Sequence, residues 1–162
     1  PGGLREVCLD RRAGLVVDVV ECHTVHRMSK KKPRPTPVAA ESISGLVDAH
    51  THLASAGAKT KPEVDAMVDR AMAAGVERLC TVGDGLGEAE LALQAAHYNE
   101  RVVAACAIHP TRAGELDHAA RARLTEMAAD PRCVAVGETG IDTYWLAHDA
   151  EGTASLEVQE EA

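Results

Sequence analysis

From residue 46 onward, short runs of apolar residues alternate with longer segments in which apolar side chains recur every three or four positions. The short runs predict strands, and the longer segments predict amphipathic helices. Polar residues, glycine or proline separate the segments, which is typical of short connections. The pattern predicts strands at 46–50, 78–82, 102–108 and 133–136, and helices at 61–74, 88–98, 115–129 and 155–162.

This alternation of strands and helices predicts an α/β fold with a parallel sheet, whose apolar strands we expect to be buried on both faces. Both a (β/α)₈ barrel and an open doubly wound sheet fit the pattern. The first turn, Thr51-His52-Leu53, is not a glycine-rich phosphate loop, so the barrel is favoured. A complete barrel has eight strands and about 250 residues. We therefore expect this chain to supply about the first four βα units.

Two histidines end the first predicted strand. His50 and His52 are two residues apart, so their side chains point to the same side of an extended strand, together with that of Asp48. Two imidazoles aimed at one point predict a metal-binding pair that needs further ligands. The strongest candidate partner is Glu138, which follows the fourth predicted strand. The alternative is that the histidines are ordinary strand-end residues and that Glu138 forms a surface salt bridge.

His109 and Asp142, which follow the third and fourth strands, are further candidates for substrate contacts or for support of the ligands. One hypothesis is that His109 contacts a substrate phosphate, and another is that it shapes the His-Pro turn. Asp142 is expected to orient a loop or a ligand histidine. Asp48 is expected to support the two histidines rather than to bind metal. For Tyr144 and Trp145, both base stacking and core packing stay open.

Composition and charge limit the possible functions. Apolar residues make up 46% of the 162 residues, which is enough for a globular core, and the formal net charge is −8. No segment has the roughly 20 apolar residues needed to span a bilayer, and none has the pattern of a secretory signal. The odd number of cysteines, five, favours reduced thiols in a cytoplasmic protein. A chain without a broad basic face would need bound cations to contact a polyanion.

The domain organisation is uneven. Residues 1–27 are expected to be an upstream or non-native leader, because Met28 opens a plausible natural start. Residues 28–45 are predicted to be a basic, proline-rich flexible segment. Residues 46–162 would then form half of a barrel, and its last part, 138–162, holds seven acids and no Lys or Arg.

Residues 46–162 contain three motifs: Asp48-Ala49-His50-Thr51-His52, Ile108-His109-Pro110, and Gly-Glu-Thr-Gly-Ile-Asp-Thr-Tyr-Trp at 137–145. Together they resemble the motifs of the TatD family of metal-dependent deoxyribonucleases. The resemblance covers about 46–162 and depends on the order of the motifs, since H-x-H alone also occurs in amidohydrolases. Small departures are Ala107 in place of a glycine, Thr139 in place of an apolar residue, and an apparent insertion at 146–154.

The resemblance implies a metallo-dependent hydrolase on a TIM-type barrel, with two divalent metal ions and DNA phosphodiester bonds as the substrate. His50 and His52 would bind the first ion, and Glu138 would bridge both and thereby be catalytic. Mg, Mn or Zn are the candidate ions, and the sequence does not identify which of them is bound. Water activated by the metal would be the nucleophile. The family's remaining ligands come from later strands, so we expect this chain by itself to be an inactive fragment.

Two alternatives remain at this point. The first is an amidohydrolase-type enzyme that cleaves a C–N bond in a small molecule. A lysine is common at the end of the fourth strand in that class, where this chain has Glu138. The second is a non-catalytic half-barrel that pairs through its open sheet edges. The sequence identifies no stable protein partner.

Overall fold

The computed structural model describes Val38 and residues 41–162. The predicted leader at 1–27 and most of the basic segment at 28–45 lie outside these residues.

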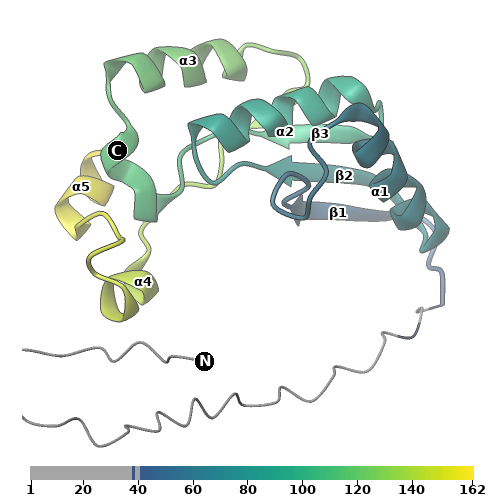
Figure 1. The fold of residues 1–162 in the computed structure, drawn as a ribbon, viewed down its shortest axis with the longest axis horizontal. Coiled ribbons are helices and arrows are strands. Elements are labelled where there is room, and N and C mark those ends of the chain that lie inside the picture. Colours follow the sequence, from purple (N-terminus) through teal and green to yellow (C-terminus); the bar gives the residue numbers. More distant parts are fainter. Residues whose placement is uncertain (1–37, 39–40) are drawn as a thin grey trace, which may run out of the picture. The chain divides into compact units, whose positions relative to one another are not determined.

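The described residues form a four-stranded parallel sheet in the order β1-β2-β3-β4, with a helix between each pair of successive strands. This arrangement confirms the predicted α/β fold (Figure 1). The sequential order of its parallel strands is that of part of a (β/α)₈-type barrel. The elements are β1 (Leu46–Thr51), α1 (Lys61–Ala73), β2 (Val76–Val82), α2 (Leu86–Tyr98), β3 (Val102–Ala105), the 3₁₀ helix η1 (Pro110–Glu115), α3 (His118–Ala128), β4 (Cys133–Ala135), α4 (Thr143–His148) and α5 (Leu156–Glu161).

The core lies between the sheet and the helices α1, α2 and α3, which cover one face (Figure 1). Val64 and Val68 of α1 are fully buried there, and α2 contributes small alanines that let the helix lie close to the strands. Val47 of β1, Val134 of β4 and Val136, which directly follows β4, are exposed. The expectation that all strands are buried on both faces therefore fits the inner strands better than β1 and β4.

Two boundaries of the predicted elements differ from the sequence-based prediction by three residues, and the others by at most two. The helix expected at 115–129 begins at His118, because the side chain of Asp117 accepts a hydrogen bond from Ala120 N at 2.7 Å and caps it. The preceding residues form η1, which starts at Pro110. The strand expected at 102–108 ends at Ala105, and its continuation leads to the site.

Within the described residues, no helix is both long and apolar enough to cross a membrane. Cys80, Cys106 and Cys133 are free thiols.

Candidate metal centre

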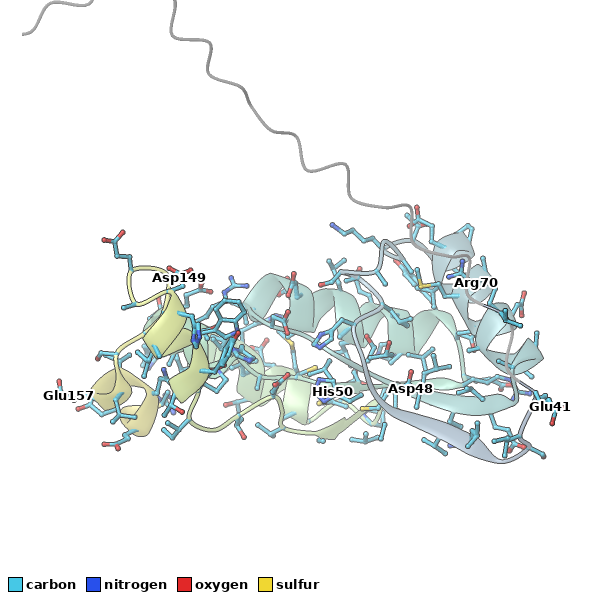
Figure 2. All side chains as sticks on the ribbon, turned by 90° about the horizontal axis from the view of Figure 1, so that it is seen from below. Glu41, Asp48, His50, Arg70, Asp149 and Glu157 are labelled. Carbon is cyan, nitrogen blue, oxygen red and sulfur yellow. The ribbon has the colours of Figure 1, made fainter. Side chains whose placement is uncertain are left out.

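The two histidines predicted as ligands meet at the carboxyl end of β1. His50 is in the strand and His52 directly follows it, and their Nε2 atoms are 3.2 Å apart. The ring centroids are 5.1 Å apart, with the rings edge to face. Figure 2 shows His50 and Asp48 along this strand. The spacing of the two residues thus brings their side chains to one point, as the sequence predicts.

The orientation of the His52 ring is set by the neighbouring strand. Its Nδ1 lies 3.0 Å from the backbone oxygen of Val82, at the end of β2. A carbonyl oxygen only accepts hydrogen bonds, so Nδ1 must carry the proton and donate it. Asp84 Oδ1 is a second acceptor, 3.3 Å from the same nitrogen. The neutral imidazole therefore presents a free lone pair on Nε2, the form that binds a metal.

Glu138 reaches the histidines from the segment that follows β4. Its Oε2 is 3.2 Å from His50 Nε2, and a donor atom from each of Glu138, His50 and His52 lies within 4.8 Å of the others. Two acceptors, His52 Nε2 and Glu138 Oε2, face His50 Nε2, which can carry only one proton. Without a cation, that proton cannot satisfy both of them. A cation among the three groups would instead accept all their lone pairs. The donor set of two imidazoles and one carboxylate thus fits a divalent transition-metal ion.

His109 also faces Glu138, but in the opposite tautomer. Its Nδ1 accepts a hydrogen bond from Thr111 N at 3.2 Å and lies 2.8 Å from Thr111 Oγ1. An accepting Nδ1 carries no proton, so in the neutral ring Nε2 has it. That Nε2 is 3.5 Å from Glu138 Oε1. His109 therefore directs an N–H group toward the carboxylate and offers it no lone pair.

The structure places the remaining predicted residues, Asp48 and Asp142, around this cluster rather than in it. Asp48 Oδ1 accepts a hydrogen bond from His50 N at 3.2 Å, which holds the end of the strand. Asp142 caps α4, because its Oδ1 accepts from Trp145 N at 2.9 Å. Tyr144 and Trp145 are both exposed, which disfavours core packing for either ring.

An open cavity of about 470 Å³ surrounds the cluster. Sequence reasoning did not include Asp84, Glu88, Thr111 or Arg112 among the site residues. Their positions in the chain could have identified two of them, since Asp84 follows β2 and Arg112 follows the His-Pro turn after β3. The residues that line the cavity are His50, His52, Asp84, Glu88, His109, Thr111, Arg112, Glu138 and Trp145.

A parallel βα sheet with a His-His-Glu cluster at the carboxyl ends of its strands is typical of metal-dependent hydrolases built on the (β/α)₈ barrel. Comparison with known proteins agrees with this class. The model of the family "TatD related DNase" matches residues 47–162, and the chain belongs to this family.

Several curated relatives are similar over the same region. "Uncharacterized metal-dependent hydrolase TatD" of Mycobacterium tuberculosis is 51% identical over 117 residues, which are 72% of this chain and 44% of the relative. "3'-5' ssDNA/RNA exonuclease TatD" of Escherichia fergusonii is 35% identical over 78 residues, 48% of this chain and 30% of the relative. "Uncharacterized metal-dependent hydrolase YabD" of Bacillus subtilis is 30% identical over 100 residues, 62% of this chain and 38% of the relative. The chain thus spans less than half the length of these relatives.

Proposed function

We propose that this chain is part of a metal-dependent hydrolase that cleaves phosphodiester bonds in nucleic acid, with single-stranded DNA as its substrate. The observation that carries the proposal is the convergence of His50, His52 and Glu138 within 4.8 Å of one another at the carboxyl ends of the strands. The name of the Escherichia fergusonii relative, a 3'-5' ssDNA/RNA exonuclease, supports the class of substrate.

His50 and His52 would hold one cation through their Nε2 atoms, and Glu138 would supply a carboxylate oxygen. When bound, a divalent cation lowers the pKa of water and stabilises negative charge on phosphate oxygens. The two oxygens of Glu138 face different groups, Oε2 toward His50 and Oε1 toward His109. Oε2 would thus be the oxygen that meets this cation, because Oε1 faces the N–H group of His109. The two imidazoles favour Zn²⁺ or Mn²⁺ over Mg²⁺.

The surrounding residues fix the ligands in place. The hydrogen bond from His52 Nδ1 to Val82 O keeps the lone pair of Nε2 pointed at the cluster. The N–H of His109 would hold Glu138 or donate to a substrate oxygen. Trp145, at the rim of the same cavity, offers an exposed ring on which a base could stack.

Among the described residues, one cluster of His, Cys, Asp and Glu has the geometry to hold a metal. Its three donors suffice for one cation, and we expect the 162-residue chain to bind that cation without turning over substrate. Membership in the family favours a phosphodiester as the bond that is cleaved, rather than the C–N bond of a small molecule.

The proposal is tested with the 162-residue chain, MnCl₂ or ZnCl₂, and a 5′-labelled oligothymidylate. We expect binding of the cation by calorimetry, and binding of the oligonucleotide that EDTA reverses. The double variant His50→Ala, His52→Ala should lose both, whereas His97→Ala, on the exposed surface of α2, should lose neither. Binding of the cation or of the oligonucleotide that survives the double substitution would overturn the proposal.

A further inference from the structure

The cavity around the metal cluster contains one strongly basic side chain among the described residues that line it, that of Arg112. Its other ionisable groups are histidines and the carboxylates of Asp84, Glu88 and Glu138. A phosphodiester substrate is an anion, and a guanidinium can donate two parallel hydrogen bonds to phosphate oxygens. Arg112 is therefore the side chain in this cavity with the chemistry to hold a phosphate group.

Glu115 holds the guanidinium by one edge. Arg112 Nε donates to Glu115 Oε1 at 2.7 Å, and Nη2 donates to Oε2 at 2.8 Å. These two bonds raise the pKa of Arg112 above its ordinary value, since they favour the charged form. A guanidinium has five N–H groups, so three remain, including the pair at the Nη1–Nη2 end. The Arg112 side chain is 41% exposed, and within the described residues its guanidinium donates only to Glu115, so the remaining N–H groups are available to a ligand.

Gly85 provides the surface on which the guanidinium lies. A Cβ atom added at Gly85 would overlap the end of the Arg112 side chain. The two segments are tied together, because His109 N donates to Asp84 O at 3.1 Å. Farther along η1, Thr111 O accepts from Ala154 N at 2.7 Å. The backbone of Gly85 is extended (φ −159°), so any residue can adopt it, and glycine is needed there for the space.

We propose that Arg112, oriented by Glu115 and seated over Gly85, binds a phosphate group of the nucleic-acid substrate beside the His50–His52–Glu138 cluster. This role rests on the proposed function. It makes Gly85 a positioning residue, since replacing its hydrogen with a methyl group would displace the guanidinium without removing its charge.

The test measures the binding of a 5′-fluorescein-labelled oligothymidylate to the 162-residue chain by fluorescence anisotropy, in MnCl₂ and over a series of salt concentrations. Arg112→Gln and Gly85→Ala should each weaken binding by about tenfold or more, because a charge-assisted hydrogen-bond pair is lost. Arg112→Lys should lie between, since lysine keeps the charge but lacks the planar fork. The slope of log Kd against log salt should fall by about 1 in Arg112→Gln.

Arg70→Gln is the matched control, because it removes one positive charge from α1, well away from His50 in Figure 2. It should change Kd less than twofold, an effect within about 0.4 kcal/mol (RT ln 2). Circular dichroism checks that each variant is folded, and Gly85→Ala gives a second route if Arg112→Gln is not. A wild-type chain that binds no oligonucleotide overturns the proposed function and this inference with it. Equal binding by wild type, Arg112→Gln and Gly85→Ala overturns the inference alone.

Discussion

His52 Nδ1 lies 3.0 Å from the backbone oxygen of Val82, and this contact between β1 and β2 decides which nitrogen of the ring faces the site. Because the acceptor is a main-chain carbonyl, no side-chain substitution at Val82 removes it. The lone pair of Nε2 is therefore fixed by the parallel pairing of the two strands. The sheet acts as the orienting partner that a ligand histidine usually finds in a carboxylate or a carbonyl.

From this orientation we predict that His52→Ala lowers the affinity for Mn²⁺ or Zn²⁺ severely. The loss should exceed the roughly 10–100-fold that follows mutation of a group that merely orients a ligand. Isothermal titration calorimetry measures the affinity directly. His97→Ala serves as the control, because His97 is exposed and pairs with Asp130 at 2.8 Å. Equal affinities of His52→Ala and His97→Ala would rule His52 out as a ligand.

Gln159 of α5 is expected to hold the segment that carries Glu138. Its side chain is buried, with Oε1 accepting from Asp142 N at 2.7 Å and Nε2 donating to Ala154 O at 2.8 Å. Truncation in Gln159→Ala leaves both backbone groups without these partners. We predict a loss of about 1–3 kcal/mol in the free energy of unfolding, measured in urea.

The matched control for this change is Gln94→Ala, which truncates an exposed glutamine on α2. Surface substitutions of this kind stay within about 0.5 kcal/mol. If both variants unfold at the same urea concentration, the hydrogen bonds of Gln159 do not stabilise the chain. If Gln159→Ala is destabilised, we also expect weaker cation binding, because the segment between β4 and α4 positions Glu138.

The sequence predicts the parts of this structure that depend on local periodicity. The spacing of His50 and His52 places both imidazoles at one point because a strand repeats every two residues. The start of α3 was predicted too early, since Glu115 and Leu116 continue an apparently helical pattern while the Asp117 side chain forms the cap. A hydrophobic pattern does not show which side chain will turn back to its own backbone.

The surroundings of the site depend on contacts between segments far apart in the chain. The tautomer of His52 is set by Val82, 30 residues later. Arg112 meets Gly85 because η1 is hydrogen-bonded to the loop after β2. Neither relationship leaves a signal in the spacing of residues, so the sequence identified candidate ligands better than the residues that orient them.

The buried thiol of Cys106 is expected to make the stability of the folded chain depend on pH in the alkaline range. The residue is 1% exposed, and burial, together with the nearby Cys133 thiol, raises the pKa of the Cys106 thiol from 9.0 to about 12. In the unfolded chain the thiol ionises near the lower value. Above pH 9.0 the unfolded state therefore loses a proton that the folded state retains, and stability falls as the pH rises toward 12.

We predict that the stability of Cys106→Ala falls less between pH 8 and pH 11 than that of the wild type. The difference between their free energies of unfolding should therefore narrow over this range. The range spans the ionisation of an ordinary thiol. Urea unfolding at several pH values measures it. Labelling with iodoacetamide gives an independent check, since Cys106 should react more slowly than the half-buried Cys133. Rapid labelling of Cys106 in the folded chain would contradict both expectations.

Trp145, the one tryptophan of the chain, lies at the rim of the site cavity with 47% of its surface exposed. If the cavity accepts single-stranded DNA, a base can stack on this ring, and stacking quenches its fluorescence. We predict that an oligothymidylate lowers the emission of Trp145 in a saturable way. An emission that does not change while anisotropy shows binding would mean that Trp145 does not stack on the substrate.

Asp142 should affect the quenching of the Trp145 fluorescence, because it stabilises the helix that carries Trp145. Its Oδ1 accepts from Trp145 N at 2.9 Å and caps α4, a helix of only six residues. Asp142→Ala removes the cap at a cost of about 0.5–2 kcal/mol, enough to fray so short a helix, whereas Asp142→Asn keeps a good capping residue. The alanine variant should therefore bind the oligonucleotide with less quenching, and the asparagine variant should resemble wild type. Equal loss in both variants would instead assign the effect to the charge of Asp142, because the charge is what the two substitutions remove in common.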